Sequence, residues 1–210
     1  IYAIRRYSIL KLDPIAGIFK PLITQDDPAR IKDQGFYYSC HYIDYYGNHW
    51  VGTSSGLELY EMNGREQPDF DKPQTFYHHQ SDTTSLRNQN ILCITEDSDH
   101  NIWVGTMNGL TRIVNENGKR RFVNYSTRNG LKNNVIYAIL NDSLTGHLWI
   151  STNNGLTEFA TRGFAIATYD IHDGLQSNEF NSYAAFKATD GELYFGGIDG
   201  YTSFYPRQII

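Results

Sequence analysis

The chain has 210 residues, a formal net charge of −5 and a pI near 5.8. Proteins that bind nucleic acid concentrate Lys and Arg on one face, so this charge balance argues against a nucleic-acid partner. No apolar run is long enough to cross a bilayer as a helix, which argues against direct membrane insertion by this segment.

One thirteen-residue phrase recurs along the chain. A weak copy begins at Ile1, with Ser8 at the glycine position, and four clearer copies follow: NHWVGTSSGLELY (48–60), NIWVGTMNGLTRI (101–113), HLWISTNNGLTEF (147–159) and ELYFGGIDGYTSF (192–204). The aromatic positions are 48, 53, 46 and 45 residues apart and are held by Tyr2, Trp50, Trp103, Trp149 and Tyr194. Self-similarity at such a period indicates a repeat architecture.

Each phrase predicts a β-hairpin, because residues 102–106 are β-branched or aromatic and Asn108-Gly109 suits a tight turn. An apolar run precedes each phrase, as in ILCITE (91–96), and an aromatic run follows it, as in RFVNY (121–125). These runs add a strand on either side, and no helical periodicity is present. Four antiparallel strands per period are what a β-propeller blade requires.

The sequence therefore predicts an all-β fold, a single β-propeller fragment over residues 1–210. We expect three whole blades at 36–80, 90–126 and 135–170, and partial blades at 1–24 and 181–206. The chain begins with Ile in the middle of a repeat, so we expect it to be part of a longer protein. Trp50, Trp103 and Trp149 are predicted to pack between blades. Tyr194 holds the same structural position of the repeat, and the turn glycines are Gly56, Gly109, Gly155 and Gly200.

Cys40 and Cys93 occupy the same register, ten residues before their Trp, where later repeats have Ala138 and Ala184. A position that takes only Cys or Ala suits a crowded innermost strand. Equivalent positions on neighbouring inner strands are too far apart for a disulfide, so two free, buried thiols are expected.

The turn between the second and third strands shares a face of a propeller with the crossover to the next blade. We predict that ligand binds on this face, to the mostly polar turn residues and to the neighbouring crossovers around 26–33, 81–90, 126–134 and 170–181. The predicted turn residues are Arg5, Arg6, Ser54, Ser55, Met107, Asn108, Asn153, Asn154 and Asp199. Such groups hydrogen-bond sugar hydroxyls. The alternative is structural, because Asn-Gly turns satisfy backbone geometry and Asn134 and Asn178 can tie a crossover to neighbouring backbone.

Catalytic, metal and cofactor sites are not indicated. The seven His residues lack ligand spacing, and Asp97-x-Asp99-x-Asn101 departs from a calcium loop at its sixth and twelfth positions, Ile102 and Asn108. The basic cluster 119–121 is interpreted as a solvated strand edge, with a specific anionic partner as the alternative.

The pattern W-[IV]-G-T-x-x-G-L, preceded by G-L-x-x-N-x-[IV] and an acidic hairpin, resembles the two-component regulator propeller repeat. Gly130-Leu131 with Asn134, Trp103 to Leu110 and Trp149 to Leu156 carry this resemblance. Residues 178–181, 194–197 and 204–206 resemble the family's closing blade.

The resemblance implies part of a seven-bladed propeller in the periplasmic sensor region of a Bacteroidetes hybrid two-component protein. Its ligand would be an oligosaccharide, its partners the rest of its own ectodomain and a second copy in a homodimer, and the histidine kinase would lie in the missing C-terminal part of this inner-membrane protein. The segment itself would be non-catalytic. Two alternatives stay open: a propeller-type polysaccharide lyase or hydrolase, and a protein-binding scaffold.

Overall fold

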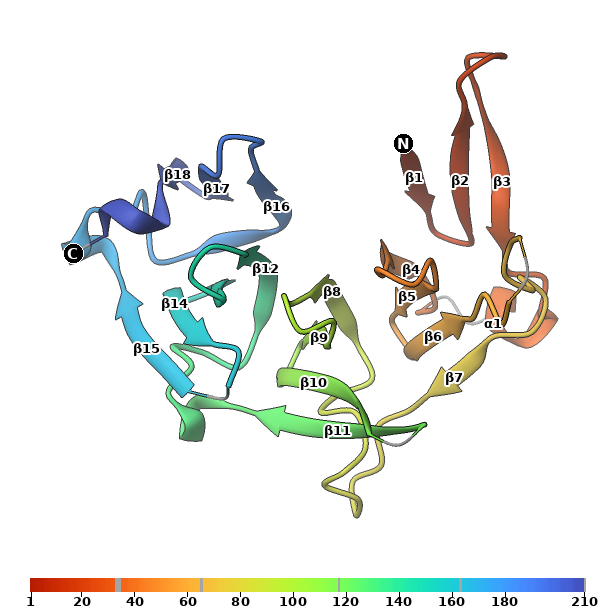
Figure 1. Ribbon diagram of the computed structural model, residues 1–210, viewed down its shortest axis with the longest axis horizontal. Coiled ribbons are helices and arrows are strands. Elements are labelled where there is room, and N and C mark those ends of the chain that lie inside the picture. Colours follow the sequence, from red (N-terminus) through yellow and green to blue (C-terminus); the bar gives the residue numbers. More distant parts are fainter. Residues whose placement is uncertain (33–34, 65, 117, 163, 210) are drawn as a thin grey trace.

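Five antiparallel sheets fan out along an arc (Figure 1), and we number them sheet 1 to sheet 5 in chain order. The computed structural model describes residues 1–32, 35–64, 66–116, 118–162 and 164–209. Sheets 2, 3 and 4 have four strands each, and sheets 1 and 5 have three. The predicted all-β propeller architecture of three whole and two partial blades is confirmed, while a total of seven blades stays a prediction.

Within each sheet the strands pair in sequence order, from the innermost to the outermost. The bounds are, for sheet 1, β1 Tyr2–Arg5, β2 Ser8–Asp13 and β3 Ile18–Thr24; for sheet 2, β4 Tyr38–Ile43, β5 His49–Thr53, β6 Gly56–Tyr60 and β7 Gln74–Phe76; for sheet 3, β8 Ile91–Glu96, β9 Ile102–Thr106, β10 Gly109–Glu116 and β11 Lys119–Tyr125; for sheet 4, β12 Ile136–Asp142, β13 His147–Thr152, β14 Gly155–Ala160 and β15 Phe164–Tyr169; for sheet 5, β16 Phe180–Lys187, β17 Leu193–Gly197 and β18 Gly200–Phe204.

Within the described residues, the crossovers and the segment after β18 contain short helical pieces that the sequence analysis did not predict. They are one α-helix, α1 (Pro28–Lys32), and three 3₁₀ turns, η1 (Thr127–Asn129), η2 (Ile171–Asp173) and η3 (Pro206–Gln208). Helix α1 begins where Asp27 accepts the amide N–H of Ala29 at 2.8 Å and Pro28 fixes the first helical φ. At five residues, α1 is too short for apolar periodicity to reveal it.

The hydrophobic core is divided into four layers, one between each pair of consecutive sheets. Strand β9 shows why the second strand of a sheet is buried on both faces. Ile102 and Val104 belong to the layer shared with sheet 2, whereas Trp103 belongs to the layer shared with sheet 4. Every residue of β9 is buried, because both faces of its sheet are covered.

Each Trp stacks on an aromatic side chain from the fourth strand of its own sheet. Ring centroids lie 6.3 Å apart for Trp50 with Phe76, 5.6 Å for Trp103 with Tyr125 and 5.5 Å for Trp149 with Tyr169, with interplanar angles of 21°, 25° and 26°. The following sheet then covers the indole; in sheet 5, for example, the Phe204 ring meets Trp149 edge to face, with ring centroids 4.6 Å apart. A buried aromatic of this size removes about 150–250 Å² from water, so these rings are the main source of adhesion between the sheets.

A buried carboxylate ties the first hairpin to the indole in sheets 2 and 3. Asp97 accepts the Nε1–H of Trp103 at 2.7 Å and the backbone amides of Asp99 and Asn101 at 3.0 and 2.9 Å. Asp44 does the same for Trp50 at 2.9 Å. These bonds give the calcium-like pattern Asp97-x-Asp99-x-Asn101 a structural role, because the Asp97 carboxylate oxygens already accept hydrogen bonds from the hairpin and from the indole.

Sheet 4 breaks this pattern because its first hairpin is one residue longer. The Asp142 carboxylate accepts Leu144 N–H at 3.1 Å and the Thr145 hydroxyl at 2.7 Å. The buried Nε1–H of Trp149 therefore finds no acceptor among the described residues.

The turn between the second and third strands explains the Thr and Gly of the repeated phrase. Thr106 donates its hydroxyl to Gly109 O at 2.7 Å and accepts Asn108 N–H at 3.1 Å. Gly109 has φ +120°, and a Cβ there would meet Tyr125 O at 2.6 Å. Thr53 and Thr152 make the same bonds at 2.9 Å to Gly56 O and Gly155 O.

The inner and second strands fit together by matched side-chain size. Cys93 lies opposite Gly105 and Cys40 opposite Gly52, whereas sheet 4 places Ala138 opposite Ser151. Both cysteines are free, as predicted. Burial raises the pKa of the Cys40 thiol to about 12, and that of Cys93 rises in the same direction and for the same reason.

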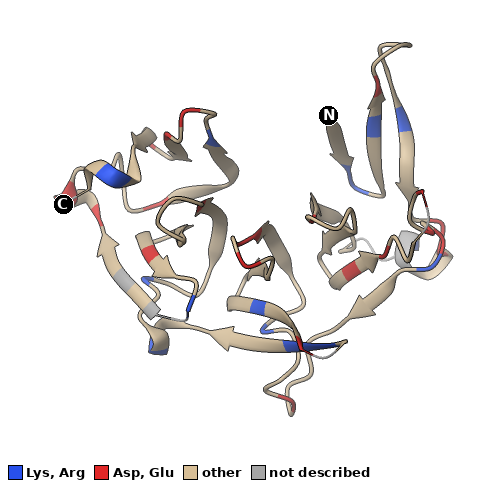
Figure 2. Cartoon of the chain, viewed as in Figure 1, with Lys and Arg blue, Asp and Glu red and all other residues tan. Residues whose placement is uncertain are grey.

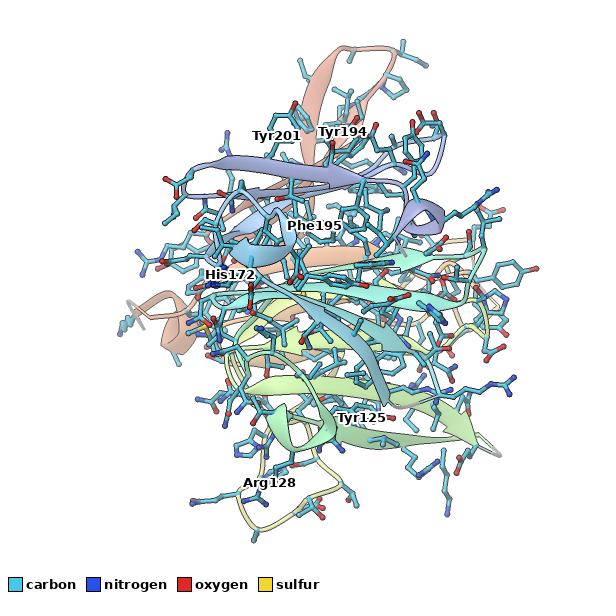
Figure 3. All side chains as sticks on the ribbon, turned by 90° about the vertical axis from the view of Figure 1, so that its left-hand side faces the viewer. Tyr125, Arg128, His172, Tyr194, Phe195 and Tyr201 are labelled. Carbon is cyan, nitrogen blue, oxygen red and sulfur yellow. The ribbon has the colours of Figure 1, made fainter. Side chains whose placement is uncertain are left out.

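The last sheet has one covered and one exposed face (Figure 3). Phe195 points into the layer shared with sheet 4, while Tyr194 and Tyr201 lie on the opposite side, where Tyr201 is 68% exposed. Tyr194 holds the position that Trp occupies in sheets 2 to 4, so this face corresponds to the one that the next sheet covers elsewhere.

The basic cluster 119–121 is engaged within the chain. Arg120 donates to Gln74 at 2.8 Å and pairs with Glu61, and Arg121 pairs with Glu116 at 2.7 Å. These contacts support the interpretation as a solvated strand edge.

Replacing Trp103 with Phe is expected to destabilise the protein more than the same change at Trp149. Trp103→Phe leaves a buried carboxylate oxygen of Asp97 without one of its donors, whereas Trp149→Phe removes an N–H that has no acceptor. Since hydrogen bonds to charged groups contribute about 1.5–3 kcal/mol, we expect a difference of about 2 kcal/mol between the variants in urea unfolding. Equal losses would contradict a stabilising role for the Asp97 bond.

Gly105→Ser is expected to destabilise the chain by about 1–3 kcal/mol through overpacking. A Cβ at Gly105 would collide with Cys93 Sγ and approach Ile136 Cγ2 to 2.6 Å. Adding Cys93→Ala reproduces the Ala138–Ser151 pair of sheet 4 and should restore part of the loss. A double-mutant cycle by thermal unfolding measures this coupling, and strictly additive effects would rule out size matching.

Candidate functional site

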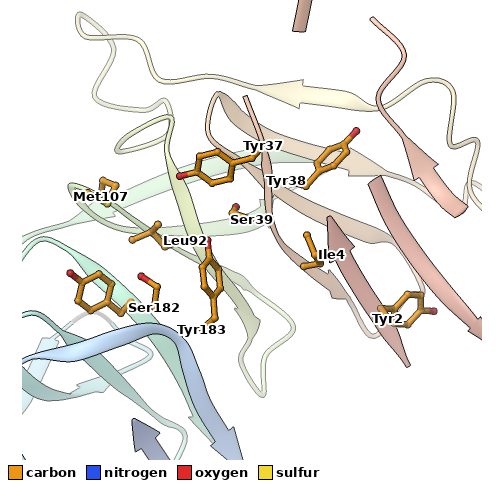
Figure 4. Close-up of a pocket in the computed structure, with 10 residues that line it drawn as sticks. Tyr2, Ile4, Tyr37, Tyr38, Ser39, Leu92, Met107, Ser182 and Tyr183 are labelled. Atoms are coloured by element: carbon orange, nitrogen blue, oxygen red, sulfur yellow. The ribbon is translucent and has the colours of Figure 1, made fainter. Parts of the chain in front are cut away.

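A cavity of about 910 Å³ lies on the concave side of the arc (Figure 4). We call it the axial funnel. Five of its lining residues lie on β4, β8 and β12 or just before β4, and the others come from β1, β16 and one turn. The lining residues are Tyr2, Ile4, Tyr37, Tyr38, Ser39, Leu92, Met107, Tyr137, Ser182 and Tyr183.

A bulge in each of β4, β8 and β12 turns one residue toward the funnel. The register of β4 with β5 passes from Tyr38–Thr53 to Cys40–Gly52, which leaves Ser39 unpaired. Leu92 in β8 and Tyr137 in β12 occupy the same unpaired position. An extra residue bends the strand and redirects a side chain, so the bulges turn these residues toward the axis.

Tyr183 has the most unusual backbone of the funnel residues. Its φ is +62°, in the left-handed region, within the irregular part of β16, and its side chain is 60% exposed. This conformation costs a residue with a side chain about 1–2 kcal/mol. Figure 4 shows its ring converging with Tyr37 and Leu92 on one space, with Met107 at the rim.

The funnel wall contains no charged residue among those that line it, and Figure 2 shows the charges mainly on turns and outer strands. Its polar groups are tyrosine and serine hydroxyls, which both donate and accept hydrogen bonds. Partial burial raises the pKa of Tyr183 to about 12, so this hydroxyl is neutral at physiological pH. An uncharged, aromatic wall with several hydroxyls suits an uncharged, polyhydroxylated ligand.

Seven of the nine predicted ligand residues lie on turns between the second and third strands of their sheets. Arg5 and Arg6 lie at the turn from β1 to β2, and β1 carries Tyr2, the counterpart of the Trp on the second strand of sheets 2 to 4. Seven of the nine residues are exposed: Arg5, Arg6, Met107, Asn108, Asn153, Asn154 and Asp199. Met107 alone among the nine also lines the funnel.

Two predicted ligand residues instead hold chain segments together. Arg6 donates its Nε–H to Phe36 O at 3.2 Å, and Ser54 Oγ accepts Tyr37 N–H at 3.1 Å. Both contacts fix the start of β4. Asn134 and Asn178 likewise accept the N–H of Thr127 and Ile171 at 2.9 and 2.8 Å, which is the structural role considered for them. Asp33, in the first crossover, lies outside the described residues.

The sequence analysis missed the tyrosines of the funnel. One signal for them was available, since Leu92, Tyr137 and Tyr183 each directly precede the Cys or Ala of the inner strand. Alternation alone places these residues in a core layer, because a bulge leaves no mark in a pattern of apolar and polar residues.

Within the described ranges, no group of three His, Cys, Asp or Glu side chains is arranged to hold a metal ion. In the same part of the chain, no helix is long and apolar enough to cross a membrane.

A histidine pair supports the funnel wall at Tyr2. The Tyr2 ring lies 4.7 Å from that of His41, edge to face, and His41 Nε2 lies 2.9 Å from His49 Nδ1. Burial, then repulsion by His49, lowers the pKa of His41 to about 4. Burial also lowers the pKa of His49. The pair is therefore held in its neutral form.

Comparison with known proteins assigns the repeats. Residues 85–108 and 130–154 match the family described as two component regulator propeller. These repeats belong to the two-component regulator propeller family.

Two further comparisons extend the similarity over most of the chain. The sequence is 33% identical over 169 residues to a protein of Formosa agariphila named "Histidine kinase P4", and the match covers 80% of this chain but 12% of that protein. The extracellular domain of BT4673 from B. thetaiotaomicron, named as a one-component system, superposes with a TM-score of 0.64 at 22% identity, covering 97% of this chain and 27% of that one.

An enzyme has a similar fold. Virginiamycin B lyase from Staphylococcus aureus superposes with a TM-score of 0.60 at 16% identity, over 95% of this regulator-propeller chain and 63% of the lyase. At this level of identity the likeness concerns the fold alone.

Stability should fall as the pH drops from about 6.5 toward 4. Since the folded-state pKa of His41 lies below the unfolded value near 6.5, the unfolded chain binds more protons in this window, and stability present above it is lost on acidification. His41→Gln should flatten the dependence by up to about 1.4 kcal/mol per pH unit, measured by urea unfolding at several pH values. The exposed His172 supplies the control, as His172→Gln. Unchanged slopes in His41→Gln would refute the neutral pair.

Proposed function

We propose that this chain is a ligand-sensing propeller of a hybrid two-component signalling protein, that it lies outside the cytoplasm in the periplasm, and that it detects an oligosaccharide. The regulator-propeller repeats support a signalling role, as does the relative named as a histidine kinase. The similar extracellular domain from B. thetaiotaomicron supports the location. Since this chain spans only 12% of the relative, the kinase activity is assigned to other parts of the protein.

The axial funnel is the observation that carries the ligand class. Five tyrosines, two serines and Met107 surround about 910 Å³. Rigid aromatic rings offer flat surfaces to the apolar faces of sugar rings, and neighbouring hydroxyls can satisfy the sugar hydroxyls. A pocket that is mostly apolar with a few placed polar groups is the usual form of a small-molecule site.

The lining residues come from different sheets, and this arrangement gives ligand binding a way to produce a signal. Strands of all five sheets contribute to the funnel wall, so a ligand that touches several of them binds best in one relative placement of the sheets. Binding then favours that placement, and the shift passes to the paired ectodomains of a homodimer and on to the kinase. Only a difference in affinity between the two arrangements can move this equilibrium.

Tyr183→Ala is expected to weaken oligosaccharide binding about tenfold, which corresponds to about 1.4 kcal/mol. Tyr46→Ala is the matched control, because Tyr46 is 65% exposed in the turn between β4 and β5, at the other end of the inner strands. The measurement is thermal unfolding of the intact protein against a glycan panel, where a ligand at 100 times its Kd adds about 2.7 kcal/mol.

Three outcomes would overturn the proposal. A panel without any stabilising glycan would favour a protein-binding scaffold. New reducing ends or unsaturated products during incubation would identify a lyase or hydrolase. Equal weakening by the Tyr183 and Tyr46 substitutions would remove the funnel as the site.

A further inference from the structure

A second cavity, of about 630 Å³, lies between two consecutive crossovers on the face of the predicted ligand turns. One wall is the segment 78–87, which leads toward sheet 3, and the other is the segment 124–134, which leads to sheet 4. The axial funnel and this groove have no lining residue in common.

The walls of the groove are held firmly by hydrogen bonds. The side-chain amide of Asn124 donates to Thr83 O at 2.9 Å and to Ser85 O at 2.8 Å, and these bonds join β11 to the segment 78–87. The backbone N–H of Arg87 is donated to Thr111 Oγ1 at 3.1 Å. These bonds fix the backbone before any ligand arrives, which lowers the ordering cost of binding.

The next repeat contains an equivalent arrangement with one difference in charge. Lys132 occupies the position of Arg87, since its N–H is donated to Thr157 Oγ1 at 3.0 Å in the same way. Its ammonium group pairs with Asp170 at 3.2 Å, and Asp170 is the capping residue of η2. The corresponding cap of η1 is Ser126, which carries no charge.

Arg87 is therefore left without the carboxylate that its counterpart has. Within the described residues its guanidinium makes no ion pair or hydrogen bond, although the side chain is half-buried. Its stem crosses the Gly109 turn, where a Cβ would approach Arg87 Cγ to 2.8 Å. The position of the stem is thus constrained while the charged end is unpaired.

A second cation and one acid complete the groove. Arg128, on η1, also lines the cavity and likewise has no side-chain partner in the described part of the chain; Figure 3 shows it on this crossover. The acid is Asp82, whose Oδ1 accepts the N–H and hydroxyl of Thr84 at 2.8 and 2.6 Å. Two guanidinium groups against one engaged carboxylate leave the groove with an excess of positive charge.

We propose that this groove binds the carboxylate of a uronic-acid residue in an acidic oligosaccharide, with Arg87 and Arg128 as its ligands. The inference rests on the proposed oligosaccharide-sensing function and adds a second site to it, which selects acidic sugar residues where the axial funnel suits uncharged ones. The planar fork of a guanidinium matches a carboxylate with two parallel hydrogen bonds. In the neighbouring repeat, Asp170 supplies the carboxylate from the chain itself.

The test compares uronate oligosaccharides with their carboxyl-reduced, neutral counterparts on the intact protein by calorimetry. The panel contains oligomers of galacturonate, glucuronate, mannuronate and guluronate. At least one is expected to bind, with at least tenfold weaker binding after reduction. Arg87→Ala and Arg128→Ala should each weaken uronate binding at least fivefold and leave the neutral counterpart unaffected. Arg121→Ala, which removes an exposed, paired arginine on the β10–β11 hairpin, should change neither.

The outcomes separate this inference from the proposed function. Binding of neutral glycans without any preference for uronates would overturn the groove and leave the sensor proposal intact. Uronate binding that resists both arginine substitutions but falls in Tyr183→Ala would assign the ligand to the axial funnel instead. Failure of every saccharide to bind would overturn both. Since Arg128 is exposed on a surface turn, its variant tests the proposal even if Arg87→Ala folds poorly.

Discussion

This propeller depends on one constraint: the large aromatic side chain on the second strand of each sheet must be covered by the following sheet. A single four-stranded sheet with two apolar faces cannot be stable in water, so each sheet needs a neighbour on both sides. Trp50, Trp103 and Trp149 sit at the centre of these contacts, stacked on their own outer strand and closed by the next sheet. Where the sheet is last, the corresponding Tyr194 lies on a face without such a cover (Figure 3).

Because the packing between sheets fixes only the residues that lie in the core layers, the residue types on the inner strands and in the turns can differ from one repeat to the next. The positions that pack are fixed in type, whereas the bulged positions Ser39, Leu92 and Tyr137 differ in size and polarity. The crossovers show the same freedom, with Lys132 paired to Asp170 in one repeat and Arg87 facing Ser126 in the previous one. A constant frame therefore presents two different surfaces, an uncharged aromatic funnel and a positively charged groove.

The fold could be predicted from the sequence because its strongest determinant is periodic. The spacing of the Trp positions and the Asn-Gly turns is visible without any structure, and so is the shared register of Cys40 and Cys93 on neighbouring inner strands, which predicts free thiols. Helix α1 was missed because a capping Asp and one Pro control it locally. The funnel was missed for another reason: a bulge reverses the direction of one side chain while the surrounding alternation continues.

The candidate site was predicted only in part, and the turns explain why. Every predicted residue lies on the expected face, yet Arg6 and Ser54 are engaged by backbone groups that are distant in sequence. Such contacts depend on how the crossover before β4 returns to sheet 1, which no local pattern encodes. The unpaired state of Arg87 similarly became visible only when two repeats could be compared contact by contact.

The size matching between inner and second strands has a consequence for how such repeats can diverge. Cys93 with Gly105 and Ala138 with Ser151 are alternative solutions to one packing problem, and a Cys on the inner strand excludes a Ser on the second strand, because a Cβ at Gly105 would collide with Cys93 Sγ. An exchange of one strand between repeats that combined a Cys on the inner strand with a Ser on the second strand would bring clashing side chains together. The heritable module is consequently the two-strand hairpin, and recombination between copies would be tolerated at its boundaries rather than inside it.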